Sequence, residues 1–368
     1  ALNNDVEGYV AGGVIGATLP SFMLLGTTTV ENLENAKINI SDINRTGDVT
    51  CTQACAGGIA LSAITTTITN FENSGNVTAD LNLDLNTSAI PLNCSFQSAG
   101  GIVGAQLKFP LIIDKSSNSG NISSTSIGTT TSCNGYEGVA QGIGGVIGTF
   151  LGPVDGAFAF VLGDYKTNTF GQKKLTILDT TNSGNINTNV PYYSGGLAGF
   201  IFGDAVLDNT SSSGNVNSSA LADPMFDLRV NYVATGGLVG KIMGGGEVVP
   251  TEEGMPFVTV KNAQISNSHA TGNVYSKNIS GGFIGSLPGL TDISKSYATG
   301  DVTGTIAGGF IGGSASSALD VLGIVGSTNI INTFSTGAVN AREDSEMLTI
   351  AGGYMGFSLF LGELNIEN

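Results

Sequence analysis

The stretch Gly281-Gly-Phe-Ile-Gly285 is followed by Ile293-Ser-Lys-Ser-Tyr-Ala-Thr-Gly-Asp-Val302 and then by a second copy of itself, Gly308-Gly-Phe-Ile-Gly312. Two short motifs therefore alternate. One is a double glycine before apolar residues, and the other is a small residue, then Gly, a polar residue and a β-branched residue. The repeat from 281 to 308 is 27 residues long. A repeat of this kind that fills a chain dictates its fold.

Both motifs recur along the whole chain in strict alternation. Longer units, many of about 44 residues, add residues either between the double glycine and the second motif or directly after the second motif. Insertions confined to two points are typical of loops on a regular scaffold. The double glycines start at Gly12, Gly57, Gly100, Gly144, Gly195, Gly236, Gly281, Gly308 and Gly352, and the second motif has its glycine at Gly47, Gly75, Gly120, Gly184, Gly214, Gly272, Gly300 and Gly337.

The apolar stretches are short, rich in Val, Ile, Phe and Thr, and bounded by Gly, Asn, Ser or Asp, which is a strand signature. About three short strands fit in the 27-residue unit, which suits one coil of a stack with strands about 4.8 Å apart. We therefore expect an all-β chain that forms a parallel β-solenoid of about eight or nine coils with loop inserts. It would be a single domain over 1–368, with the clearest repeats at 230–356.

The fixed glycines indicate either a backbone turn with positive φ or a position with no room for a Cβ atom. The Asn or Asp that follows the second-motif glycine suits a turn of that kind, because both residues tolerate it and bond locally. For Asp48 and Asp301 this turn role is favoured over metal binding.

The residues at 265–313 resemble GLUG repeats. The resemblance rests on Ile265-Ser-Asn-Ser-His-Ala-Thr-Gly-Asn-Val274, on the equivalent 293–302 and on the intervening Gly-Gly-Phe-Ile-Gly, with a weaker copy at 333–339. It covers roughly 230–356 well and 1–230 more loosely. GLUG repeats occur in bacterial and archaeal surface proteins and adhesins with β-solenoid character, so the resemblance implies that fold and a cell-surface role. It carries over no catalytic residue.

The composition limits the partners. The formal net charge is −16, with 13 Lys plus Arg against 29 Asp plus Glu, so a nucleic-acid backbone is excluded as a partner. No EF-hand or similar calcium loop is present, and we expect no metal and no cofactor.

The chain begins with Ala1, which fits a secreted protein whose signal peptide has been removed. Residues 142–163 are mostly apolar but contain Pro153 and a double glycine in register, so we expect no membrane span. Within them, we expect the apolar insert 154–162 to cover an end of the core or to contact another subunit.

Four cysteines, Cys51, Cys55, Cys94 and Cys133, define a region at 51–133 that we expect to carry two disulfides. Cys51 and Cys94 each precede a double glycine by six residues and would lie in adjacent coils, within bonding distance. The alternative links Cys51 with Cys55 and Cys94 with Cys133, and this local pairing is slightly favoured.

Nine glycosylation sequons are present, a modest excess over chance, and they indicate a glycoprotein in an archaeal or eukaryotic source. The candidate residues are Asn39, Asn44, Asn76, Asn86, Asn93, Asn121, Asn209, Asn217 and Asn278.

We expect no enzyme. The single histidine, His269, aligns with Tyr297 of the next repeat, which indicates a surface position rather than a catalytic base. Acidic pairs are few, as at 252–253 and 343–344, so carboxylate chemistry has no cluster to use. Threonine runs at 65–69 and 129–132 do not recur at one coil position, so an ice-binding or carbohydrate-binding threonine face is also disfavoured.

Neither end of the sequence shows a capping helix or a charged edge strand, and apolar residues lie near both ends. We therefore expect a homopolymer, a surface filament assembled head to tail through the solenoid ends. The alternative is an adhesin or glycan-binding solenoid within a longer protein, with other surface proteins or glycans as partners. The assembly candidates are Tyr9, Val10, Val14, Ile15, Tyr354, Met355, Phe357, Leu359, Phe360 and Leu361.

Overall fold

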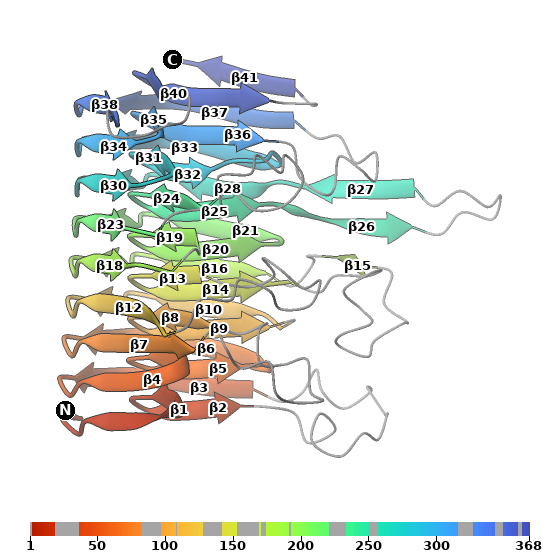
Figure 1. Ribbon diagram of the computed structural model, residues 1–368. Helices are drawn as coiled ribbons and strands as arrows, with labels where there is room; N and C mark the ends of the chain where they lie inside the picture. Colours follow the sequence, from red (N-terminus) through yellow and green to blue (C-terminus); the bar gives the residue numbers. More distant parts are fainter. Residues whose placement is uncertain are drawn as a thin grey trace.

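The chain is all-β and its large sheets are parallel, as the sequence predicts (Figure 1). The computed structural model describes residues 2–18, 37–82, 97–107, 109–127, 142–152, 169–170, 174–190, 193–220, 233–249, 257–315, 327–342, 349–359 and 363–368. No helix occurs within these ranges. The strands are stacked one above another, with β1 (Val6–Gly12) at one end and β41 (Glu363–Glu367) at the other.

The first sheet has 16 strands arranged as two adjoining rows. β1 and β4 (Val49–Ala56) run through both rows, because β4 pairs with β7 through Val49–Cys51 and with β8 through Ala54–Ala56. One row continues with β7 (Val77–Asn82), β12 (Ile122–Ile127), β18 (Ile186–Thr188), β23 (Val216–Ser218), β30 (Val274–Ser276), β34 (Val302–Gly304) and β38 (Val339–Ala341). The other continues with β8 (Ser98–Gly100), β13 (Gly142–Gly144), β19 (Tyr193–Gly195), β24 (Ala234–Gly236), β31 (Ile279–Gly281), β35 (Ile306–Gly308) and β39 (Ile350–Gly352).

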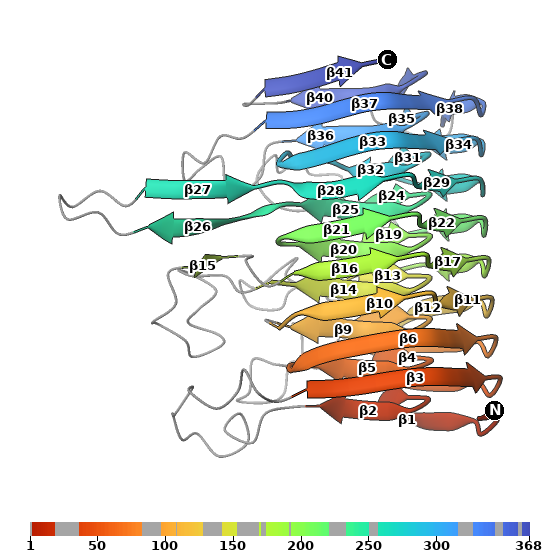
Figure 2. The ribbon, with the colours of Figure 1, turned by 180° about the vertical axis from the view of Figure 1, so that it is seen from behind.

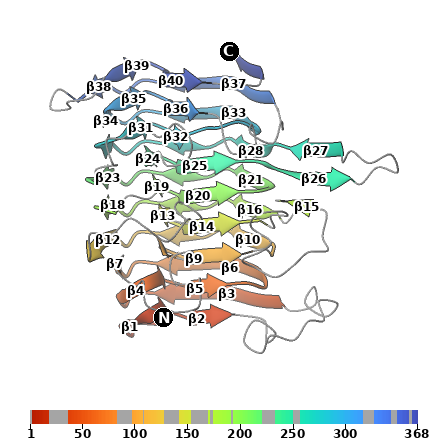
Figure 3. The same ribbon diagram turned by 45° about the vertical axis from the view of Figure 1, so that its right-hand side comes forward.

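The second sheet has nine strands, and its spatial order is the order of the chain (Figure 3). Each strand follows a double-glycine motif. The strands are β2 (Ile15–Thr18), β5 (Ile59–Ser62), β9 (Val103–Leu107), β14 (Ile147–Leu151), β20 (Ala198–Phe202), β25 (Val239–Met243), β32 (Ile284–Ser286), β36 (Ile311–Ala315) and β40 (Met355–Leu359).

The third sheet has 13 strands and forms the face seen in Figure 2. Besides β41 it contains β3 (Lys37–Arg45), β6 (Thr65–Asn73), β10 (Leu111–Asp114), β11 (Ser117–Asn118), β16 (Leu175–Leu178), β17 (Thr181–Asn182), β21 (Ala205–Asp208), β22 (Ser211–Ser212), β28 (Ala263–Ser266), β29 (His269–Ala270), β33 (Thr291–Ala298) and β37 (Ser327–Ser335). A small antiparallel sheet of β15 (Thr169–Phe170), β26 (Gly245–Val249) and β27 (Phe257–Lys261) projects from the stack.

The chain passes through the first, second and third sheets in turn and then returns to the first, an arrangement consistent with a parallel β-solenoid. Segments of variable length occur between strands of the second and third sheets, as between β25 and β28, or between the two rows of the first sheet, as between β23 and β24. These are the two insertion points that the motif spacing predicts.

Interior side chains form columns because the register is kept from turn to turn. In the third sheet, one column runs through Ile40, Ile68, Ile113, Ile177, Leu207, Ile265, Ile293, Ile330 and Ile366. A second-sheet column runs through Ile15, Ile59, Val103, Ile147, Ala198, Val239, Ile284, Ile311 and Met355. All members of both columns except Ile15, Met355 and Ile366 are buried, so like residues stack into one long core.

The repeated glycines are required by close contact and not by a left-handed backbone. A Cβ atom on Gly272 would lie 2.0 Å from the carbonyl oxygen of Gly214 one turn earlier, and one on Gly300 would lie 1.9 Å from that of Gly272. Among the described glycines, positive φ occurs at Gly203 and Gly289, outside both motifs. Of the two roles expected for the motif glycines, the structure selects the lack of space.

The double glycine of the second turn is displaced by one residue. Ala56 pairs with Gly12 and Gly100, so Gly57 corresponds to the second glycine of the other turns and Gly58 to an apolar residue. The buried Phe71 ring fills the resulting space, because a Cβ atom on Gly58 would meet it at 3.3 Å. Compensation from a neighbouring strand therefore keeps the core filled.

Left-handed backbone does occur, at a different corner and without glycine. Eight residues at one corner of the third sheet have φ between 45° and 58°, namely Asp42, Asn70, Lys115, Asp179, Asn209, Asn267, Lys295 and Asn332. Asn and Asp tolerate this conformation best, and the two lysines show that the corner imposes it on other residues. The residue before the second Ser of the motif Ile-Ser-x-Ser thus makes this turn.

The contact at the second-motif glycines yields a prediction. Gly272→Ala is expected to lower the free energy of unfolding by about 1–3 kcal/mol, because the new methyl group overlaps the Gly214 carbonyl and the turns must separate. Gly8→Ala is the matched control, since its nearest neighbour would be 3.6 Å away. Denaturant unfolding of both variants measures the difference; equal stabilities would contradict the steric explanation.

Candidate functional site

The Asn and Asp residues that follow the second-motif glycines form a ladder along one outer edge. In each turn, the side-chain Oδ1 accepts the backbone N–H of the equivalent residue in the following turn, at 2.8–3.1 Å. The members are Asp5, Asp48, Asn76, Asn121, Asn185, Asn215, Asn273, Asp301 and Ala338. The sequence predicts that these side chains bond locally, and this prediction is wrong. Each side chain instead joins its own turn to the next one.

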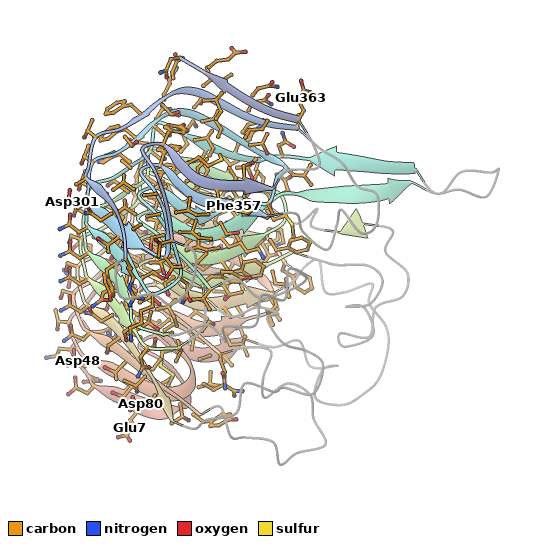
Figure 4. All side chains as sticks on the ribbon, turned by 45° about the horizontal axis from the view of Figure 1, so that its top comes forward. Glu7, Asp48, Asp80, Asp301, Phe357 and Glu363 are labelled. Carbon is orange, nitrogen blue, oxygen red and sulfur yellow. A yellow bond between two sulfur atoms is a disulfide. The ribbon has the colours of Figure 1, made fainter. Side chains whose placement is uncertain are left out.

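Asp48 and Asp301 lie along this same edge in Figure 4. Each uses Oδ1 to accept a backbone N–H, from Asn76 and Ala338 respectively. Among the described residues, no group of three or more His, Cys, Asp or Glu residues is placed to hold a metal ion. The ladder stops at Ala338, because an alanine has no oxygen to offer to a further turn.

A second polar column is buried inside the stack. Asn73 donates from Nδ2 to Asn118 Oδ1, and Asn118 donates to Asn182 Oδ1, both at 2.7 Å. Each amide also reaches the carbonyl of the glycine two residues later at 2.8 Å, so the donors are satisfied. The column was not predicted, although Asn-Ser-Gly recurs at all three positions.

Arg45 lies at the first end of this column and is fully buried. Its Nη1 donates to Asn73 Oδ1 at 3.1 Å and its Nη2 to the Asp48 carbonyl at 3.2 Å, while Nε has no hydrogen-bond partner among the described atoms. Burial lowers the pKa of Arg45, against the opposing effect of the nearby Asp48 and Asp5 carboxylates. Arg45 thus holds in β3 the register position that Asn73, Asn118 and Asn182 hold in the next three turns.

Aromatic rings stack in two columns toward the far end. On the outer face, His269, Tyr297 and Phe334 have ring centroids 4.8 and 5.0 Å apart and nearly parallel planes. Inside, Phe283, Phe310 and Tyr354 stack at 4.6 and 5.1 Å. Phe334 is 51% exposed, so the outer column ends in an open ring.

His269 lies beside Tyr297 in register, at the surface position that the alignment of repeats predicts. Burial lowers the pKa of His269, which favours the neutral ring. Its closest aromatic neighbour is the stacked Tyr297 ring. This environment gives the imidazole a packing role, and the absence of enzymatic activity stays a prediction.

The disulfide joins Cys51 to Cys55, both buried in β4, with Cα atoms 5.7 Å apart. The two residues belong to different rows of the first sheet, so the bond spans the corner between them. This local link excludes the pairing of Cys51 with Cys94 between adjacent coils. Cys94 and Cys133 lie outside the described residues, and so does the insert 154–162.

Most described sequon asparagines are on the surface. Asn39, Asn44, Asn76, Asn121, Asn209 and Asn217 are exposed, and Asn278 is half-buried. Nδ2, the atom that carries a glycan, donates a hydrogen bond in Asn44, Asn209 and Asn278. Asn39 and Asn217 make no side-chain hydrogen bond to another described residue, which leaves them the most accessible candidates. Asn86 and Asn93 lie outside the described residues.

At the first end of the stack, the predicted assembly residues fall into two groups. Val14 and Ile15 are half-buried and pack against the main core, so they present interior columns at an open end. Val10 instead packs on a second apolar cluster between the first and second sheets, and Tyr9 is 47% exposed beside it. Ile38 and Ile43 also pack against the open core. They were not predicted, although their alternation with polar residues is visible in the sequence.

At the other end, Tyr354 and Met355 are half-buried members of the main core. Phe357, labelled in Figure 4, pairs with Gly313 and ends the column that passes through Ala105 and Phe200 of the second apolar cluster, so it is not part of the main core. Leu364 and Ile366, the last members of third-sheet columns, were not predicted from the sequence; Ile366 is 50% exposed. The side chain of Leu359, and the residues Phe360 and Leu361, lie outside the described part of the chain.

Comparison with family models, with curated proteins and with solved structures found no match to this chain. No helix in the described ranges is long and apolar enough to cross a membrane.

The outer ladder predicts a small and specific loss of stability. Asn215→Ala removes the oxygen that accepts the Asn273 N–H at 2.9 Å. The free energy of unfolding should fall by about 1 kcal/mol. Asn217→Ala is the control, because Asn217 is equally exposed two residues away and makes no such bond. A comparable loss in the control variant would show that the ladder is not the cause.

Tyr354 predicts an alkaline loss of stability. Burial raises its pKa to about 12, partly offset by the hydrogen bond with Thr333. A raised pKa in the folded state favours the neutral form, so this stability is complete below about pH 10, the unfolded value, and falls as the pH rises toward 12. Tyr354→Phe should therefore lose less stability between pH 9 and 11.5 than the wild type. Parallel unfolding curves at both pH values test this, and identical losses would contradict it.

Proposed function

We propose that the protein is a non-enzymatic extracellular structural subunit, a parallel β-solenoid of nine turns that polymerises head to tail into a surface filament. The observation that carries the proposal is the state of the two ends. Strands β1, β2 and β3 at one end and β38–β41 at the other each leave one edge unpaired among the described strands. Unpaired edges are templates for pairing with another chain.

The interior columns support the same proposal. Val14, Ile15 and Ile38 at one end, and Tyr354, Met355 and Leu364 at the other, belong to the main core but remain half exposed. Where two ends meet, apolar surface would be removed from water, which contributes about 25 cal/mol per Å² to the free energy of association. A second copy is the natural occupant, because its end continues the same columns with the same types of residue.

Gly353 adds a steric argument. In the preceding turns, a Cβ atom on the equivalent glycine would lie 2.0–2.4 Å from a carbonyl oxygen of the next turn, as for Gly309 beneath Gly353. At Gly353 itself a Cβ atom would meet nothing within 4 Å. The isolated chain therefore imposes no steric requirement for glycine here, whereas a further turn stacked above it would.

The alternative is an adhesin or glycan-binding solenoid that acts as part of a longer protein. The same open edges favour it, because further turns of one polypeptide could pair with them as well as a second copy could. GLUG-like repeats in surface proteins fit both proposals. Assembly of the present chain alone distinguishes them, since the alternative needs no self-association.

Electron microscopy of the purified chain tests the filament. We expect unbranched polymers whose thickness is that of one stack. Uniformly monomeric particles across native buffer conditions would reject the proposal. Binding of glycans by those monomers would favour the alternative.

Gly353→Ala gives a sharper test of the ends. The variant should unfold like the wild type, because its methyl group meets nothing within the chain. Polymers should become shorter or disappear, since a stacked turn would place a carbonyl at about 2 Å from the new Cβ atom. Asn217→Ala, an exposed change in β23 away from both ends, is the control. Unchanged filament length in Gly353→Ala would contradict stacking at this surface.

A further inference from the structure

We infer that the two ends join in one defined register, in which the third sheet of one copy continues that of the next without a slip. This inference rests on the proposed head-to-tail filament and specifies its junction. Each copy would place its strand β3 on strand β41 of its neighbour, as β37 lies on β33 within the chain. The register follows from the columns of side chains that run through all turns.

The column of Ile40 fixes the alignment. Ile40 begins a continuous third-sheet column and Ile366 ends it, so one further turn would place Ile40 of the next copy on Ile366. Ile366 is 50% exposed, which makes it the most open apolar residue of this column. Two residues earlier, the same register puts Ile38 on Leu364, both of them half-buried members of the core. Apolar residues therefore meet at both interior positions.

The outward positions match as well. Asn39 of the next copy would lie over Asn365, which already donates from Nδ2 to Asn329 Oδ1 at 3.1 Å in the turn below. An amide column of this kind would extend by one step. A slip by one residue would instead turn Asn39 into the core and Ile40 to the outside, because successive side chains point to opposite faces. The apolar columns thus exclude odd slips.

Charge disfavours a slip by two residues. Lys37 lies three residues before Ile40, and Glu363 lies three residues before Ile366, so the proposed register brings these exposed side chains of opposite charge together. A slip by two would place either Asn39 against Glu363 or Lys37 against Asn365, and either slip would separate the two opposite charges. The chain carries 13 basic residues against 29 acidic ones. A lysine opposite a glutamate at the junction is therefore informative, although an exposed pair contributes only about 0.2–1 kcal/mol.

The interior of the second sheet agrees with this register. The second-sheet column starts at Ile15 and ends at Met355. Val14 directly precedes Ile15, and Tyr354 directly precedes Met355, so these two residues occupy equivalent positions. Val14 of the next copy would thus cover the Tyr354 ring, the last of the inner aromatic stack. The second and third sheets, which continue independently in the same register, give one consistent junction.

The corner formed by the second motif does not continue across the junction. Both copies depart from the repeat there. Asn4 occupies the place of a second-motif glycine, since a Cβ atom on Gly47 would lie 2.2 Å from the Asn4 carbonyl. In the junction, Asn4 of the next copy would lie over Gly337, and Asp5 over Ala338, which offers no ladder oxygen. Within the chain, a Cβ atom on Gly337 would lie 1.9 Å from the Gly300 carbonyl oxygen, so these two turns approach closely. The side chain of Asn4 prevents an equally close approach to Gly337. We therefore expect this corner to be slightly open, with no ladder bond across it.

Cysteine pairs test the register directly. Asn39→Cys with Asn365→Cys in one chain should form intermolecular disulfides along the polymer, because facing residues of adjacent parallel strands lie about 4.8 Å apart. The out-of-register control is Ser41→Cys with Asn365→Cys, which is displaced by two residues along the strand. Wild type and single variants give the background from the native cysteines. Non-reducing electrophoresis of preformed filaments measures the ladder of covalent oligomers.

Charge reversal gives an independent measurement. Lys37→Glu or Glu363→Lys alone should raise the concentration needed for polymerisation several-fold at low salt, and the double variant should restore it. High salt should reduce both effects. Since both side chains are exposed, none of these variants should change the unfolding curve of the monomer.

The outcomes separate the register from the filament. Filaments that cross-link through the Asn39 and Asn365 pair, but not the Ser41 and Asn365 pair, support the inference. Filaments that cross-link only through the control pair, or whose single charge variants are not rescued, overturn the register and leave the proposed function standing. Failure of the wild type to polymerise overturns both.

Discussion

Backbone packing at the glycine columns is the constraint on which the rest of the structure depends. At Gly214, Gly272 and Gly300, the carbonyl of one turn occupies the space where a side chain of the next would begin. Turns can therefore approach closely at this corner, and the parallel strands on either side keep an unbroken register. The columns of isoleucine and valine follow from that register, because each turn presents the same positions to the interior.

Ladders of side-chain hydrogen bonds join the turns that the glycines allow to approach. The Asn and Asp ladder gives each turn one bond to the next, and the buried asparagine column satisfies carbonyls that the glycine corner would leave without a partner. At about 1 kcal/mol per hydrogen bond, these contacts are small individually and repeat along the stack. Stability is thus spread over neighbouring turns, as expected for a repeat architecture.

The sequence was sufficient for the fold and for part of the site. Alternating glycine motifs predicted the parallel all-β stack, the two insertion points and the surface position of His269, because each depends on spacing alone. The direction of the ladder was not predictable, since an Asn that bonds locally and one that bonds across turns have the same spacing. Arg45 was also missed: a single cation inside a polar column carries no repeating signal. The left-handed corner was hidden by Lys295, a residue that by itself gives no indication of positive φ.

The two insertion points have a consequence for how such chains can change. Between β25 and β28 the chain leaves the stack, forms β26 and β27, and returns with the register of the third sheet intact. A segment at either point is therefore decoupled from the packing of the rod and can be lengthened, shortened or exchanged without penalty to the core. The scaffold separates the residues that determine its own geometry from those it displays, so new surface chemistry can be acquired while the rod stays the same.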